Sequence, residues 1–198
     1  MEPLKPITRQ LRAVAALGGV VCLLAWAALA VRGAEVYKPN PHDVLAGFLH
    51  RFPEHVQWPN RPATTNPAPW RIGILGDDPF GEALILVTRT NPVAGRDFEI
   101  VHATRAEDLR TCEVVYIGLK DEEKIKAALA ALAGRPILTV GETENFLKLG
   151  GVIRMELRKY AQFSVNLDAA KASDLKIKAK MLEVARQIIK DGKLNKSL

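Results

Sequence analysis

Two adjacent carboxylates, Asp77 and Asp78, follow an apolar run that is expected to form a strand, and they stand between two glycines. Gly76 and Gly81 have the G-x-x-x-x-G spacing with which a Walker A phosphate loop begins. That motif continues with Lys and then Ser or Thr, whereas this chain continues with Glu82. Because carboxylates repel a phosphate, the residue types argue against a nucleotide site at this loop.

The same stretch supports two other interpretations, which the sequence leaves open. In the structural one, Asp78 is the N-cap of a helix, Pro79 is its first residue and Glu82 is an acid in its first turn. In the functional one, the loop is part of a pocket for a polar or cationic small ligand, because open α/β sheets bind ligands at the carboxyl ends of their strands. The candidate ligand-binding residues are Asp77, Asp78, Phe80, Gly81, Gly141 and Glu142.

Other residue types give no catalytic or metal-binding pattern. His50 and His55 are five residues apart and do not share a helical face, and no H-E-x-x-H sequence occurs. No serine lies in a G-x-S-x-G elbow, and no cofactor-binding loop is found. Cys22 lies in the N-terminal apolar run, which leaves Cys112 without a second cysteine for a disulfide or a metal site. The sequence therefore predicts a protein that is not an enzyme and uses neither metal nor cofactor.

The charge of the chain excludes one class of partner. The formal net charge is +6, and the basic residues do not form the clustered stripe that is typical of nucleic-acid binders. Lysines gather between residues 176 and 196. This gathering indicates a solvated face, with a contact to a membrane surface or an acidic partner as the alternative.

The N-terminus predicts export. Lys5, Arg9 and Arg12 precede an uncharged apolar run over residues 13–31 that contains the small residues of a cleavage site near Ala30. Residues 1–30 are therefore predicted to be a cleaved signal peptide. The alternative is an uncleaved membrane anchor reaching to about residue 32, because the run is nearly long enough to span a bilayer. Both versions place the rest of the chain in the periplasm, with membrane contact only through this segment if it is retained.

The exported part, residues 42–190, is predicted to be one α/β domain. A helix over 42–58, which Pro53 should kink or end, is followed by a Pro-rich connector at 59–69. Apolar strands then alternate with helical patterns, which indicates a mainly parallel sheet with helices on both faces, a Rossmann-like three-layer arrangement. The predicted strands are 71–75, 97–102, 113–118 and 136–140, and the predicted helices are 79–90, 121–133 and a short 143–149.

The C-terminal third has a different pattern. Apolar residues alternate with period two over 153–157 and again over 161–167, which predicts an antiparallel hairpin at the edge of the sheet. A final amphipathic helix is predicted over 178–190, with Met181, Leu182, Ala185 and Ile188 facing inward.

The order of several segments resembles the YfiR-like family of periplasmic proteins. The segments are "VQWP", "WRIGILGDDPFGEAL", "TCEVVYIG", "PILTVGETENFLKLGGVIRMEL" and "FSVNLDAAKASDLKIKAKMLEVAR", and the resemblance covers about residues 43 to 189. It implies a non-catalytic regulator that binds the periplasmic part of a membrane-bound diguanylate cyclase and holds it inactive, which limits cyclic di-GMP and biofilm formation. It also makes a homodimer plausible.

The first helix is the part of the chain that the resemblance links to a partner. The aromatic side chains Phe48, Phe52 and Trp58 are the candidate partner-binding residues. In the family this helix is usually aromatic-rich and unbroken, whereas here it contains Pro53 and two histidines, His50 and His55, which affects the identity of the partner. The alternative function is a periplasmic sensory domain that binds a small ligand at the carboxyl ends of the strands.

Overall fold

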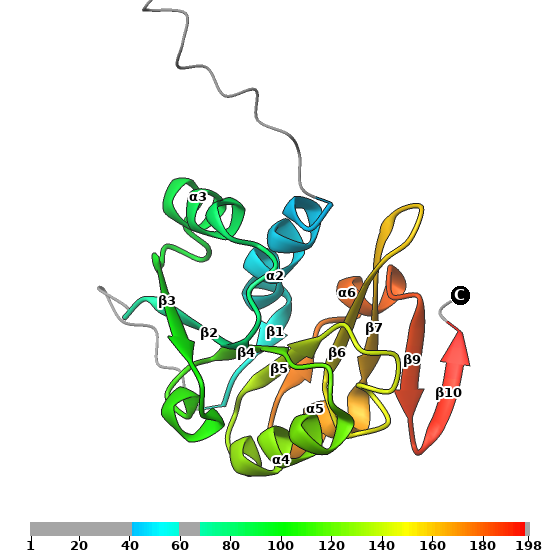
Figure 1. Cartoon of the computed structure of the whole chain (residues 1–198). Helices are drawn as coiled ribbons and strands as arrows, with labels where there is room; N and C mark the ends of the chain where they lie inside the picture. Colours follow the sequence, from blue (N-terminus) through cyan, green and yellow to red (C-terminus); the bar gives the residue numbers. More distant parts are fainter. Residues whose placement is uncertain (1–40, 60–67, 197–198) are drawn as a thin grey trace, which may run out of the picture. The chain divides into compact units, whose positions relative to one another are not determined.

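The computed structural model describes residues 41–59 and 68–196 (Figure 1). All of them belong to the second of the two compact units into which the chain divides, residues 40–198. The predicted signal peptide or anchor, and most of the predicted connector at 59–69, lie outside the described residues. Within the described part, no helix has the length and apolar character needed to cross a membrane.

The centre of the unit is an eight-stranded sheet in the order β10-β9-β7-β6-β5-β4-β2-β3. Strands β3, β2, β4, β5 and β6 run parallel to one another, β7 is antiparallel to β6, and β10 is antiparallel to β9. Their bounds are β2 Trp70–Gly76, β3 Phe98–Ala103, β4 Val114–Gly118, β5 Leu138–Gly141, β6 Ile153–Leu157, β7 Ala161–Asn166, β9 Gln187–Lys190 and β10 Lys193–Lys196. A separate small pair joins β1 (Val56–Gln57) to β8 (Lys176–Ile177).

Helices cover both faces of the sheet. One core contains side chains of α2 (Asp43–His55), α3 (Glu82–Thr90) and α6 (Ala179–Glu183), and the other contains those of the 3₁₀ helix η2 (Ala106–Leu109) and α4 (Glu122–Leu132). The helix α5 (Leu167–Ala172) follows β7 directly. The predicted fold class, a mainly parallel α/β sheet with helices on both faces and an antiparallel edge pair, is confirmed (Figure 1).

Local capping signals account for the helix that was predicted best. The Asp121 side chain accepts a hydrogen bond from the Lys124 amide at 2.9 Å, which satisfies one of the free N–H groups at the start of α4. Gly134, with a φ of +71°, follows the C-cap of the same helix in the left-handed conformation that glycine adopts at little cost. In α2, the helix continues two residues past Pro53 and ends at His55.

One predicted helix begins at a later residue than expected, and another does not form. Helix α3 begins at Glu82 with Gly81 as its N-cap, so Asp78 is not the N-cap and Pro79 is not helical. Asp78 instead accepts hydrogen bonds from the amides of Phe80 and Gly81, which makes a turn ahead of the helix. The predicted helix at 143–149 is a series of turns.

The predicted C-terminal helix at 178–190 is also wrong beyond its first turn. Helix α6 ends at Glu183, and β9 then pairs with β7, while β9 and β10 form a hairpin. The hairpin loop is Asp191-Gly192, and both residues have positive φ, as a type I′ turn requires. The Asp168 carboxylate accepts hydrogen bonds from both loop amides, which lowers its pKa. The predicted 153–167 hairpin is confirmed as β6–β7, but β9 and β10 occupy the edge beyond it.

A carboxylate surrounded by arginines joins β6 to the segment before β9. Glu156 contacts Arg154 at 2.9 Å, Arg158 at 2.9 Å and the Arg186 guanidinium, and its side chain is 11% exposed. Burial alone would raise the pKa of Glu156. The hydrogen bonds from Arg186, Arg154 and Arg158 outweigh burial and lower the pKa to about 2.

Glu156→Gln is expected to remove a pH-dependent part of the stability. Because the folded pKa of Glu156 is depressed, its contribution is complete above the unfolded value of about 4.5 and is lost as the pH falls toward 2. The variant should be less stable than wild type by about 2 kcal/mol at pH 7, and this difference should shrink by pH 3. Urea unfolding at both pH values measures it. An equal difference at both values would contradict the prediction.

Candidate functional site

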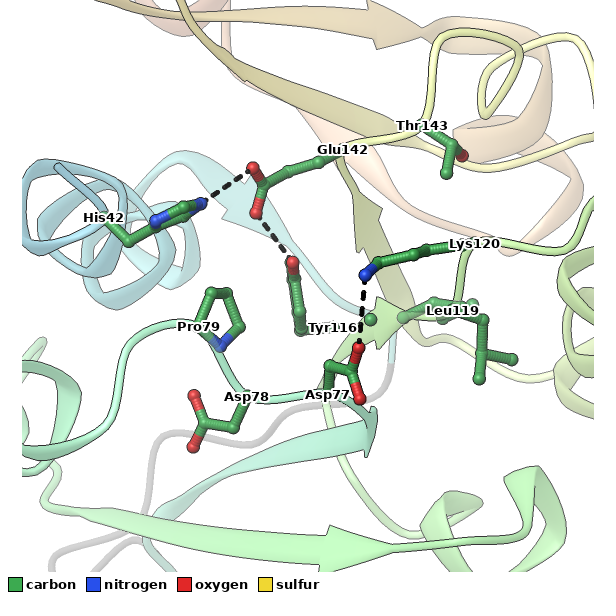
Figure 2. Close-up of a pocket in the computed structure, with 11 residues that line it drawn as sticks. His42, Asp77, Asp78, Pro79, Tyr116, Leu119, Lys120, Glu142 and Thr143 are labelled. Atoms are coloured by element: carbon green, nitrogen blue, oxygen red, sulfur yellow. Dashed lines mark hydrogen bonds and ion pairs between the residues drawn. The ribbon is translucent and has the colours of Figure 1, made fainter.

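The strand order places a cavity at the carboxyl end of the parallel sheet. From β2 the chain crosses to β3 on one side and then returns to β4 on the other side, so the direction of the crossovers reverses between β2 and β4. Ligands of open α/β sheets bind at such a reversal. A cavity of about 400 Å³ opens here, lined by His42, Asp77, Asp78, Pro79, Tyr116, Ile117, Gly118, Leu119, Lys120, Glu142 and Thr143. We refer to it as the switch-point cavity (Figure 2).

The loop after β2 contacts the last residue of β4, and both contacting residues line the switch-point cavity. The Asp77 amide donates a hydrogen bond to the Gly118 carbonyl at 3.3 Å. A Cβ at Gly118 would overlap the Asp77 carbonyl oxygen, so only glycine fits there. The close approach fixes Asp77 beside the end of β4.

Asp78 is held by its own loop and by a neighbouring strand. One carboxylate oxygen accepts the Phe80 amide at 2.9 Å and the Gly81 amide at 3.2 Å, and the other lies 2.8 Å from His102 Nε2. The Phe80 ring is buried and contacts the Tyr116 ring edge-on, with 4.7 Å between centroids. Asp78 therefore lines the cavity in a fixed position, while Phe80 belongs to the core.

Glu142 lies between a tyrosine and a histidine on the opposite side of the cavity from Asp77 and Asp78 (Figure 2). The Tyr116 hydroxyl donates to Glu142 Oε1 at 2.6 Å, and His42 Nε2 lies 3.3 Å from Oε2. Burial, together with the bonded and negatively charged Glu142 carboxylate, raises the pKa of Tyr116. Tyr116 is therefore a neutral hydrogen-bond donor at physiological pH, and it orients Glu142.

Two further lining residues, Lys120 and Asp77, form an exposed ion pair. Lys120 Nζ lies 3.8 Å from Asp77 Oδ2, and the two side chains are 90% and 79% exposed. An exposed pair at this distance contributes little stability. Among the described residues, no group of three or more His, Cys, Asp or Glu side chains is arranged to hold a metal ion.

The structure brings together half of the predicted ligand-binding residues. Asp77, Asp78 and Glu142 line the cavity, whereas Phe80, Gly81 and Gly141 do not. At Gly141 a Cβ would stand 2.5 Å from the Phe146 ring, so this glycine makes room for a core side chain. Sequence reasoning missed the lining residues His42, Tyr116, Lys120 and Thr143. The aspartates were identified because ligands of open α/β sheets bind at the carboxyl ends of the strands. The same reasoning could have found Tyr116 and Lys120, because they lie near the end of β4 and just after it.

A second hollow, of about 200 Å³, lies between α2 and α6, and we call it the α2/α6 hollow. It is lined by Phe48, Arg51, Phe52, His55, Phe163, Lys180, Met181 and Val184. Phe48 and Phe52 both contact the Phe163 ring edge-on, at centroid distances of 5.9 and 5.6 Å. Val184 is 70% exposed. The hollow is thus an apolar surface with the basic side chains Arg51 and Lys180 among its lining.

Trp58, the third candidate partner-binding residue, does not line the α2/α6 hollow. Its indole N–H donates to the Pro136 carbonyl at 2.8 Å, and its ring packs on Trp70 at a centroid distance of 5.1 Å. These contacts give Trp58 a structural role near the start of β2.

Comparison with known families places the fold and the two hollows in context. A family model described as YfiR/HmsC-like matches residues 42–186, about three quarters of the chain. The matched range begins at His42, which lines the switch-point cavity, and includes every residue that lines the α2/α6 hollow.

Proposed function

Because the chain belongs to the YfiR/HmsC-like family, we propose that it represses a membrane-bound diguanylate cyclase by binding the periplasmic part of that enzyme. Proteins of this family are periplasmic regulators of diguanylate cyclase signalling and are regulatory rather than catalytic. Repression by contact would limit the synthesis of cyclic di-GMP and, with it, biofilm formation.

The α2/α6 hollow is the observation that carries the proposed contact. An apolar hollow with an exposed valine, next to basic side chains, has the composition of an interface centre in which an apolar anchor of the partner can be buried. Arg51 and Lys180 favour a partner segment that carries acidic residues beside its apolar anchor. Within the described residues, we assign the contact to Phe48 and Val184. Phe52, which is 3% exposed and belongs to the core, and Trp58 are left out of it.

Deletion of the gene is expected to raise cellular cyclic di-GMP several-fold in a strain that possesses a cognate cyclase. The same deletion in a strain that lacks the cyclase should change nothing, and a plasmid copy of the wild-type gene should restore the low level. Mass spectrometry of cell extracts measures the nucleotide. An unchanged level after deletion in the first strain would refute repression.

The switch-point cavity favours a second candidate function, that of a sensory domain for a small ligand. Its volume falls in the range of small-molecule sites, and it lies where the topology of an open α/β sheet concentrates binding. The two functions are compatible, because a bound ligand can alter the affinity of a protein for a partner.

A further inference from the structure

The loop of the β6–β7 hairpin is a small surface whose residue types fit a lipid surface. It consists of Arg158, Lys159 and Tyr160, and the Arg158 amide closes the turn by donating to the Tyr160 carbonyl at 3.2 Å. We propose that these three residues, which we call the hairpin tip, bind the anionic phospholipid surface of a membrane. This contact is separate from the predicted N-terminal anchor and goes beyond the proposed repression.

The hairpin tip projects from the domain into solvent. In Figure 1 the loop between β6 and β7 extends beyond the neighbouring strand β9. The Arg158 side chain and Tyr160 are each 65% exposed, and Lys159 is exposed as well. Two cations and an aromatic ring are therefore available to a surface that the domain meets.

The charge at the hairpin tip stays positive after its ion pairs are counted. The Arg158 guanidinium lies 2.9 Å from Glu156. Glu156 also contacts Arg154 and Arg186, so three guanidinium groups share one carboxylate, and Lys159 adds a fourth cation. These five side chains, four cations and one anion, carry a net charge of +3. Basic residues at such a surface are attracted to anionic phospholipid headgroups.

Tyr160 supplies the apolar part of the contact. Lys159 Nζ lies 5.5 Å from the centroid of the Tyr160 ring, so the ring and the charge lie together at the hairpin tip. The ring belongs to neither core of the domain. Tyrosine has an apolar ring and a polar hydroxyl, and for this reason it is enriched at the headgroup level of membranes. Burial of the ring there removes apolar surface from water.

The size and shape of the hairpin tip favour a membrane over a protein partner. Stable protein interfaces bury about 800 Å² on each side and have a well-packed centre. The hairpin tip has three residues, and none of them lines the switch-point cavity or the α2/α6 hollow. A membrane surface requires no matching shape, because basic and aromatic side chains bind it through charge and through position at headgroup depth.

Flotation of the protein with lipid vesicles tests the proposal. The protein is residues 31–198, the product of the predicted cleavage, which contains the whole compact unit of residues 40–198. It should float with vesicles of phosphatidylglycerol and phosphatidylcholine in equal parts, and it should not float with vesicles of phosphatidylcholine alone, which have no net charge. Salt at about 1 M should release the protein, because it shortens the Debye length to about 3 Å.

The double variant Arg158→Gln/Lys159→Gln should bind the phosphatidylglycerol vesicles about fivefold more weakly for each charge removed. The matched control is Lys171→Gln/Lys190→Gln, which removes the same charge from exposed positions at the other end of the sheet. Lys171 is on α5, which follows β7, and Lys190 is the last residue of β9, which runs parallel to β7. The control should bind as wild type does.

Tyr160→Ala tests the aromatic part of the contact separately, because it leaves the net charge unchanged. It should weaken binding to the phosphatidylglycerol vesicles severalfold. Tyr160→Trp should keep the binding, and its added tryptophan emission should shift to shorter wavelength when these vesicles are present, as the indole enters the headgroup layer.

Three results would each overturn the proposal: no binding to the phosphatidylglycerol vesicles, equal losses in the two double variants, or wild-type binding by Tyr160→Ala. Binding to soluble polyglutamate at least as tight as to the vesicles would also overturn it and would indicate an acidic protein partner. The flotation contains no diguanylate cyclase. Its failure therefore leaves repression standing, and a failed gene-deletion test leaves membrane binding standing.

Discussion

Val184→Glu is expected to abolish repression while leaving the protein folded. Val184 is 70% exposed and lines the α2/α6 hollow, so the glutamate can remain in water in the free protein. In the complex it would place a charge where the apolar anchor of the partner is buried, and would repel the acidic residues that Arg51 and Lys180 favour. Substitutions at the centre of an interface cost about 2 kcal/mol or more, which is roughly a 30-fold loss of affinity.

The readout is cyclic di-GMP in a deletion strain that carries the variant on a plasmid. We expect this strain to have the same cyclic di-GMP level as the deletion strain without a plasmid. The melting temperature of the purified variant should be within about 2 °C of wild type. Val44→Glu is the matched control, because Val44 is also an exposed valine, at 57%, on α2 but outside the lining of the hollow. Full repression by Val184→Glu, or an equal loss of repression in Val184→Glu and Val44→Glu, would show that the partner binds elsewhere.

Gly118→Ala is expected to have the largest effect on stability. The new methyl group would overlap the Asp77 carbonyl oxygen, so the loop after β2 would have to move away from the end of β4. The 3.3 Å hydrogen bond from the Asp77 amide to the Gly118 carbonyl would be strained or lost as well. Backbone atoms cannot move aside as a flexible side chain can, and we expect a loss of about 3 kcal/mol in the free energy of unfolding.

The matched control for this prediction is Gly47→Ala, which is expected to increase the free energy of unfolding instead of lowering it. Gly47 lies inside α2, and a Cβ there would meet nothing within 4 Å. Alanine is favoured over glycine in a helix, so this variant should gain about 1 kcal/mol. Urea unfolding of both variants measures the difference. Similar stability of Gly118→Ala and wild type would mean that the loop after β2 is not held against the end of β4 as described.

Where the determinants of structure are local, the sequence predicted the fold well. Asp121 and Gly134 mark the ends of α4 by capping and conformational preference, and neither depends on distant residues. The apolar runs of β4 and β5 indicated strands buried on both faces of a parallel sheet. The β6–β7 hairpin followed from the period-two alternation of its side chains.

The errors arose where a tertiary contact or a short turn decided the structure. Residues 187–190 fit a helical pattern, but pairing of β9 with β7 makes them a strand. The sequence Asp191-Gly192 was a local signal for the hairpin that follows and was not used. The Asp78 side chain accepts hydrogen bonds from the amides of Phe80 and Gly81, which makes a turn, and the helix therefore begins only at Glu82.

For the site, the expectation that ligands bind at the carboxyl ends of parallel strands identified the acidic residues, but it did not identify the side chains that contact them. Asp77, Asp78 and Glu142 directly follow strands, and parallel strands end at a common edge. His42 reaches Glu142 from a point one hundred residues earlier in the chain, and no local pattern in the sequence records that contact. The α2/α6 hollow depends likewise on Phe163 and Met181, which lie far in sequence from Phe48.

The position of α2 has a consequence for the order in which the chain folds. The first described helix packs its Phe48 and Phe52 rings against Phe163, and α6, near the other end of the chain, completes the same hollow. Contacts between residues so distant in sequence form late, because a long loop must close first. During synthesis, the apolar face of α2 therefore stays unpacked until almost the entire domain has emerged. A chain truncated before Phe163 would keep that face exposed and be prone to aggregation.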